Sequence, residues 1–109
     1  MAPGRITTLP QPNTSLSTWS GLAGSENGDA ASTVRWQDKT VQCTGTFTSI
    51  TIQGSNDGTN WGTLSDAQGV DLVITVANEV RTILENPLYI RPVSVGAAGC
   101  VVLIAGSQS

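Results

Sequence analysis

The stretch from Phe47 to Trp61 reads FTSITIQGSNDGTNW, and it decides the fold class of this chain. Its first half alternates with a period of two, which places Ile50 and Ile52 on one face of an extended segment. Its second half is a cluster of turn-forming residues, and Asp57-Gly58 is the strongest hairpin signal in the chain. The stretch therefore predicts two antiparallel strands, with the returning strand running from Trp61 to Leu64.

Similar short segments rich in Thr, Val and Ile continue on both sides of this hairpin. Gly and Pro interrupt the chain throughout, and no stretch of 12 or more residues keeps a helical apolar period. Further strands are expected at residues 5–9, 15–19, 33–36, 40–44, 70–76, 79–84, 88–92 and 100–105. Turns every 8–12 residues are typical of a sandwich. The sequence thus predicts an all-β chain, a single jelly-roll-like β-sandwich of about 7–8 antiparallel strands with an extended N-terminal arm.

The composition points to a surface that packs against other proteins. The chain has 109 residues, a length typical of one domain. Only 12% of them are charged, against an average of about 25%. A surface of Thr, Ser, Asn and Gly is polar but costs little to desolvate. The net charge is −3 and the basic residues are scattered, so neither nucleic acid nor a membrane is expected as a partner.

Residues 1–30 contain three prolines and show little alternation. They can be interpreted as a floppy leader or as an extended arm that becomes ordered on a neighbouring subunit. Large apolar side chains would be poorly placed in a solvated tail, which favours the arm. The expected organisation is an N-terminal arm over residues 1–30 and a β-sandwich domain over residues 31–109. The candidate interface residues of the arm are Ile6, Leu9, Leu16, Trp19 and Leu22.

The residue types in the sequence do not indicate a catalytic site. The chain has no His, which is the commonest general acid or base at neutral pH. Most carboxylates fall in expected turns, where Asp is a good turn former. Cys43 and Cys100 are expected to be reduced, buried and unpaired, although a disulfide between them stays open. We therefore expect no catalytic residue, no metal, no cofactor and no enzyme activity.

The hairpin loop allows more than one interpretation. Its oxygens are of the kind that bind calcium, but a hairpin turn explains the same residues. Trp61 is either an exposed stacking platform for a sugar or a cap on the core below its own turn. The candidate ligand-loop residues are Asn56, Asp57, Asn60, Trp61 and Tyr89.

Targeting signals are not expected either. The first residues lack the apolar core of a signal peptide, and no apolar run approaches 18 residues. The chain is thus expected to be made in a cytoplasm and to leave it only as part of a larger particle.

The stretch from Phe47 to Trp61, together with the later ENPLYIRP from Glu85 to Pro92, resembles small phage virion proteins, including the capsid cement (decoration) proteins. The resemblance covers about residues 38–105. It implies a module that assembles as a dimer or trimer on the outer surface of a tailed-phage head, often with an extended terminal arm. The implied partner is the major capsid protein, whose neighbouring subunits the module bridges, and the implied location is the virion.

Part of the same stretch also resembles a second family. Ser55 to Trp61 is similar to a hairpin of discoidin (F5/8 type C, galactose-binding-like) domains, and Tyr89-Ile90-Arg91 is a partial match to a later strand of these domains. That resemblance implies a carbohydrate-binding module, for example in a tail fibre or baseplate. The cement protein is the leading prediction, and the carbohydrate-binding module or another virion domain is the alternative.

Overall fold

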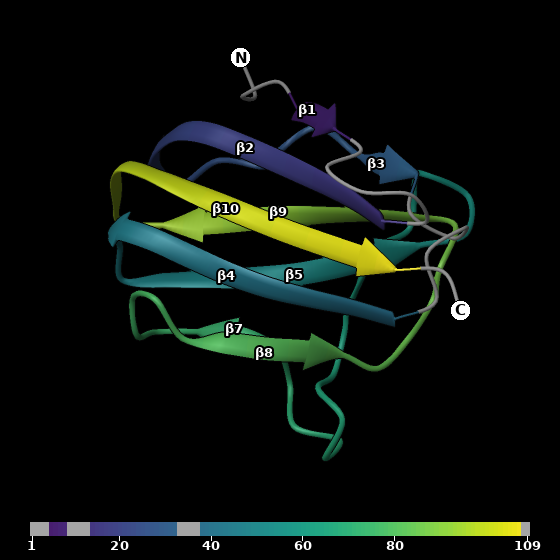
Figure 1. Ribbon diagram of the computed structural model, residues 1–109. Helices are drawn as coiled ribbons and strands as arrows, with labels where there is room; N and C mark the ends of the chain where they lie inside the picture. Colours follow the sequence, from purple (N-terminus) through teal and green to yellow (C-terminus); the bar gives the residue numbers. More distant parts are fainter. Residues whose placement is uncertain (1–4, 9–13, 33–37, 108–109) are drawn as a thin grey trace.

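The computed structural model describes residues 5–8, 14–32 and 38–107, which form a sandwich of two antiparallel sheets (Figure 1). The described residues confirm the prediction of an all-β, jelly-roll-like fold, with ten strands where about 7–8 were expected. No helix in these residues is long and apolar enough to cross a membrane.

The first sheet lies in front in the view of Figure 1 and the second lies behind it. The order in the first sheet is β1 (Arg5–Thr8), β2 (Thr14–Gly24), β10 (Ala97–Ser107), β4 (Asp38–Thr46) and β8 (Val80–Ile83). The order in the second sheet is β3 (Ala31–Ser32), β9 (Tyr89–Val95), β5 (Ser49–Ser55) and β6 (Gly62–Thr63), and β7 (Val73–Ile74) also pairs with β5. Strands far apart in the sequence are therefore neighbours in both sheets.

The core lies between the two sheets and is built by the alternation that the sequence shows. Ile50 and Ile52 have no exposed surface, as the period of two in this segment predicts. Trp19 is the largest buried side chain, and its indole Nε1 donates a hydrogen bond to the carbonyl oxygen of Asp29 at 2.8 Å. The other fully buried apolar side chains include Leu22, Val41, Cys43, Leu72, Ile90, Cys100 and Val102.

The expected boundary between an arm and a sandwich at residue 31 needs correction. β2 is an 11-residue strand paired with β1 on one side and β10 on the other. After β2 the chain crosses to the second sheet and forms two backbone hydrogen bonds with β9. The Gly28 N–H donates to the Pro92 carbonyl oxygen, and the Ser94 N–H donates to the Glu26 carbonyl oxygen. Residues 14–30 are thus part of the sandwich.

A bulge explains why the sequence predicted only residues 15–19 of β2 as a strand and assigned them to an arm. Leu22 pairs with Cys100 and Trp19 with Val102, so β2 advances three residues while β10 advances two. The extra residue turns both Trp19 and Leu22 into the core and breaks the strict alternation that marks a strand. Gly21, with φ of +74°, supplies the backbone conformation that this bulge needs.

Other expected elements are found with changed bounds. The expected strand at 33–36 lies outside the described residues. The expected strand at 70–76 is reduced to β7, because the Leu72 N–H bonds to Leu64 while the Leu72 carbonyl accepts from Ile52. Both cysteines are buried and free, so the disulfide that the sequence left open is not formed in the structure.

Candidate functional site

The hairpin loop after β5 is organised around the carboxylate of Asp57. Its Oδ1 accepts hydrogen bonds from the Ser55 hydroxyl and from the backbone N–H groups of Thr59 and Asn60, each at 2.8 Å. Its Oδ2 accepts from the Asn60 side-chain amide, also at 2.8 Å. These bonds, with the Asn60 N–H foremost, hold the pKa of Asp57 well below its usual range. The carboxylate is thus engaged in closing the loop, which favours the turn interpretation over a calcium site.

No cluster of three or more His, Cys, Asp or Glu side chains is placed to hold a metal ion in the described part of the chain. Cys43 and Cys100 contribute no reactive thiol either. Burial, with the nearby Cys100 as a second cause, raises the pKa of Cys43 to about 12, and burial also raises the pKa of Cys100. A thiol with so high a pKa stays protonated at neutral pH and is a poor nucleophile.

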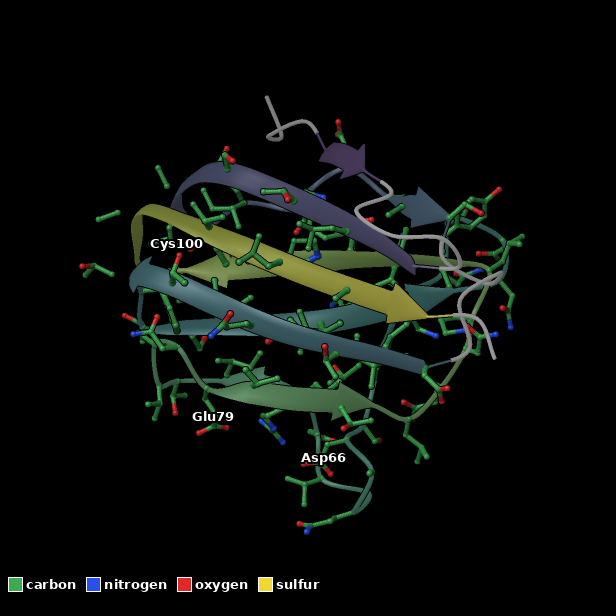
Figure 2. The ribbon with its side chains drawn as sticks, in the orientation of Figure 1. Asp66, Glu79 and Cys100 are labelled. Atoms are coloured by element: carbon green, nitrogen blue, oxygen red, sulfur yellow. The ribbon has the colours of Figure 1, made fainter. Side chains whose placement is uncertain are left out.

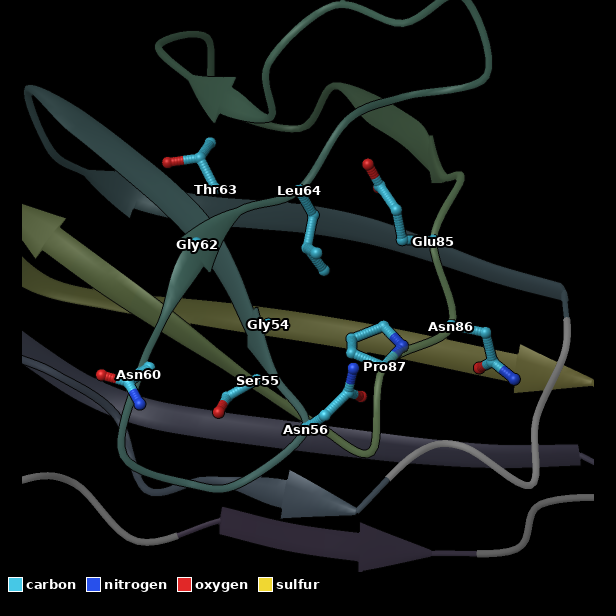
Figure 3. A pocket seen from close by; sticks show the side chains of 10 residues that line it. All are labelled: Gly54, Ser55, Asn56, Asn60, Gly62, Thr63, Leu64, Glu85, Asn86 and Pro87. Carbon is cyan, nitrogen blue, oxygen red and sulfur yellow. The ribbon is translucent and has the colours of Figure 1, made fainter.

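A pocket of about 520 Å³ lies between the hairpin loop and the segment before β9 (Figure 3). It is open to solvent and lined by Gly54, Ser55, Asn56, Asn60, Gly62, Thr63, Leu64, Glu85, Asn86 and Pro87. Asn56 joins its two walls, because its Oδ1 accepts a hydrogen bond from the Leu88 N–H at 3.0 Å. None of the lining side chains is aromatic, so the pocket offers polar contacts to a ligand and no stacking platform.

Trp61 lies apart from that pocket and is partly covered. The Arg91 guanidinium sits over its indole ring, 4.2 Å from the centroid, and the Arg91 Nε donates to Gln53 Oε1 at 3.0 Å. Burial lowers the pKa of Arg91. One face of the indole is therefore taken by a cation–π contact and is closed to a sugar ring.

The candidate ligand-loop residues are not gathered around one cavity. Asn56 and Asn60 line the pocket, while Asp57 holds the loop together. Tyr89 is half-buried and pairs with Ser55 across the two strands, outside the pocket lining.

The candidate interface residues fall in three different places. Trp19 and Leu22 have no exposed surface and pack in the core of this same chain, which corrects their assignment to a partner's surface. Leu16 is half-buried on the outer side of the first sheet. Ile6 lies in β1, where it pairs with Thr18, and Leu9 lies outside the described residues.

The outer side of the first sheet is a surface that sequence reasoning did not find. The strand register forms two rows that each cross four strands: Thr18, Leu103, Gln42 and Val80 in one, and Leu16, Ala105, Thr40 and Thr82 in the other. Their sequence neighbours Trp19, Val41 and Ile104 point into the core, so these eight side chains point outward. None of the eight is charged, and we call this surface the charge-free face. It contains a shallow hollow of about 260 Å³ lined by Leu16, Thr40, Gln42, Val80, Leu103 and Ala105.

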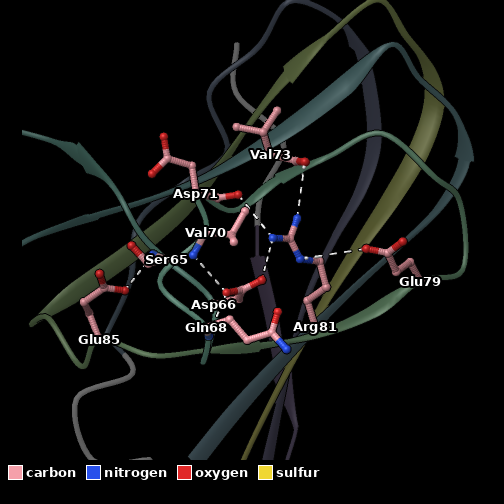
Figure 4. Close-up of polar contacts among 9 residues, drawn as sticks. All are labelled: Ser65, Asp66, Gln68, Val70, Asp71, Val73, Glu79, Arg81 and Glu85. Atoms are coloured by element: carbon pink, nitrogen blue, oxygen red, sulfur yellow. Dashed lines mark hydrogen bonds and ion pairs between the residues drawn. The ribbon is translucent and has the colours of Figure 1, made fainter.

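Charged groups gather instead on the loop between β6 and β7 (Figure 4). Asp66 accepts hydrogen bonds from the backbone N–H groups of Gln68 and Val70 and forms an ion pair with Arg81 at 2.8 Å. The Arg81 guanidinium also donates to the carbonyl oxygen of Asp71 at 3.2 Å. These contacts, with the Arg81 hydrogen bond as the largest cause, lower the pKa of Asp66. They fasten the loop to β8.

Comparison with known proteins identifies the fold without assigning a family. No protein-family model matches the chain, and no curated protein matches its sequence. The crystal structure of the SPBc2 prophage-derived protein YomS is similar, with a TM-score of 0.66 and 13% identity, over 94% of this chain and all of that one. A cupin domain (bp2299) from Bordetella pertussis Tohama I has a TM-score of 0.53 and 11% identity, over all of this chain and 98% of that one. The chain is a jelly-roll-like antiparallel β-sandwich.

Proposed function

We propose that this chain is a structural protein of a phage virion, and specifically a cement protein that binds the outer surface of the head and bridges neighbouring major capsid subunits. The observation that carries the proposal is the structural similarity of 94% of this chain to the whole of a prophage-derived protein. A virion protein of this kind needs stable surfaces for other proteins and no reactive group.

The arrangement of the two sheets supports a bridging role. A module that joins two subunits needs at least two separate contact surfaces. The sandwich has the charge-free face on its first sheet and, on its second sheet, an outer side that carries Trp61 stacked with Arg91. Trp, Tyr and Arg are the residues that most often dominate the binding energy of protein interfaces. The two surfaces face opposite ways and differ in chemistry, which suits them to different partners.

The experiment that tests this function follows the native protein in the lysate of cells that produce it. An antibody detects the chain after sedimentation, and a cement protein is expected to travel with megadalton particles and to leave them only on denaturation. Recombinant chain added to heads that lack it should bind again at saturating, stoichiometric occupancy. Recovery of the chain only at the mass of a free monomer or small oligomer would overturn the proposal.

A carbohydrate-binding role is the second candidate, and the polar pocket beside the hairpin loop is the observation in its favour. A glycan array probed with the purified chain is expected to give a hit that Thr63→Arg removes, because Thr63 lines the pocket. Thr51→Arg, on the outer side of the second sheet, is the control that should keep the hit. An array without any hit would contradict the carbohydrate-binding role.

A further inference from the structure

We propose that the charge-free face is the interface through which this chain pairs with a second copy of itself about a twofold axis. The pairing is tested on the purified protein alone. Because it covers the charge-free face, a dimer would bridge capsid subunits through the outer sides of its two second sheets. The pairing also selects the dimer from the two oligomers, dimer or trimer, that the resemblance to cement proteins implies.

The first argument is the distribution of charge. Eight outward side chains over four adjacent strands carry no charge, although the chain as a whole has a net charge of −3. The labelled carboxylates Asp66 and Glu79 lie below the edge strand β8 in Figure 2, away from the middle of the sheet. Lys39 is buried, Arg91 lies on the second sheet, and the exposed Asp38, two residues before Thr40, lies at the rim of the face where β4 begins. Two like-charged copies therefore meet the least repulsion when these faces meet.

The second argument concerns what can cover such a face. Charged side chains of a partner would be desolvated on this face, and no opposite charge on the face would compensate for the lost hydration. Leu16, Val80 and Leu103 supply apolar contact, while Thr18, Thr40 and Thr82 carry hydroxyl groups that both donate and accept hydrogen bonds. Such a surface is complementary to itself. A twofold axis places the same patch on both sides of the interface.

The third argument is the size of the face. Four strands about 4.8 Å apart and about five residues long at 3.3 Å each span roughly 19 by 17 Å. Because side chains make the surface uneven, the accessible surface that the face would bury is roughly 500 Å² per copy, or about 1,000 Å² in total. That total is at the lower limit for a specific interface. We therefore expect a dimer that forms in the micromolar range and depends on concentration.

The test is sedimentation equilibrium of the full chain from about 1 to 200 µM, a range that brackets a micromolar dissociation constant. The wild-type chain is expected to pass from monomer to dimer. Leu103→Asp, in the middle of the face, should lower the association constant at least about tenfold, because a desolvated like-charge pair forms at the axis. Ala105→Glu, at an exposed position of the same face whose side chain makes no hydrogen bond, is a second variant that should weaken the dimer.

Two controls make the outcome decisive. Thr51→Asp places the same charge on the half-buried outer side of the other sheet and should leave the dimer intact. A mixture of Leu103→Asp with Leu103→Lys should associate although each variant alone does not, since the two opposite charges then meet across the axis. Circular dichroism checks that each variant is folded. A wild-type chain that stays monomeric at the highest concentration, forms a trimer, or dissociates equally with Thr51→Asp would overturn the proposal.

Discussion

At the scale of single residues, side chains pack tightly where β5 meets the segment before β9. Gly54 and Gly62 are partners in the β5–β6 pair, yet their surroundings differ. A Cβ atom on Gly54 would lie 2.7 Å from a methyl carbon of Leu64 and would also meet the ring of Pro87, whereas one on Gly62 would meet nothing within 4 Å. The absence of a side chain at Gly54 is therefore required by packing.

This contrast predicts opposite outcomes for two matched substitutions. Gly54→Ala should lower the free energy of unfolding by about 1–3 kcal/mol, because the added methyl group overpacks a filled site. Gly62→Ala should change it by less than about 0.5 kcal/mol. Urea unfolding followed by tryptophan fluorescence measures both. Equal losses in the two variants would contradict the packing argument.

The burial of Cys43 and Cys100 predicts that neither thiol reacts readily in the native state. With a pKa of about 12, Cys43 is ionised in roughly one molecule in ten thousand at pH 8. A chromogenic disulfide reagent at pH 8 should therefore react slowly with the native chain and should titrate both thiols rapidly in denaturant. Fast reaction of two thiols with the folded protein would show that the core around β4 and β10 opens readily.

At the scale of elements, the loop between β6 and β7 depends on one ion pair. Arg81 reaches from β8 to the Asp66 carboxylate and to the Asp71 carbonyl, and Asp66 in turn caps the turn formed by its own backbone neighbours. The loop also contributes Leu72 to the core, so its position affects the packing between the sheets.

The lowered pKa of Asp66 predicts a pH-dependent stability with a definite sign. Because the pKa of Asp66 in the folded chain lies below its ordinary value of 3.8, the ionised carboxylate stabilises the native state. This stabilisation is complete above about pH 5 and is lost as the pH falls through the folded pKa. Asp66→Asn should thus melt at a lower temperature than wild type at pH 6, and the gap should narrow as the pH falls below the ordinary pKa of 3.8.

Asp71→Asn, on the same loop, is the matched control and should follow the wild-type curve more closely. A gap between Asp66→Asn and wild type that is the same at every pH would mean that the side chain acts through its shape and not through its charge.

Several elements follow from local pattern alone. Strict alternation predicted β5, and the Asp57-Gly58 signal predicted its turn, because both features depend on residues close in the sequence. β2 was misjudged because its bulge places Trp19 and Leu22, three residues apart, on the same side. β7 was overestimated because the alternation of apolar residues in 70–76 does not reveal that Leu72 bonds irregularly to both Leu64 and Ile52.

At the scale of the whole molecule, the N-terminal third is structural. Deletion of residues 1–30 removes β1, β2, Trp19 and Leu22 together and should leave a chain without cooperative unfolding, because a core that loses its largest side chain is left with a large cavity. Deletion of residues 1–13 removes only the edge strand β1 and should leave a folded sandwich. Thermal melts by circular dichroism distinguish the two. A cooperative melt after the larger deletion would show that the arm interpretation applies to residues 14–30 after all.

The charge-free face could not have been found from the sequence. Its rows join Thr18, Leu103, Gln42 and Val80, which are far apart in the chain, and their adjacency depends on the sheet order β2-β10-β4-β8. Local patterns predict which residues of a strand point outward, but not which strands become neighbours. Four of the five ligand-loop residues lie within residues 56–61 and were easy to single out. The structure shows Asp57 bonded to Asn60, Asn56 to the Leu88 N–H, and Trp61 covered by Arg91.

The sheet order also has a consequence for how the protein is made. Of the ten described strands, β10 leaves the ribosome after the other nine, and it lies in the first sheet between β2 and β4. Until it emerges, both of its neighbours have unpaired edges and Trp19 lacks its cross-strand partner Val102. A nascent chain in that state exposes apolar surface and strand edges that invite aggregation. We therefore expect the first sheet to close only after β10 has been translated.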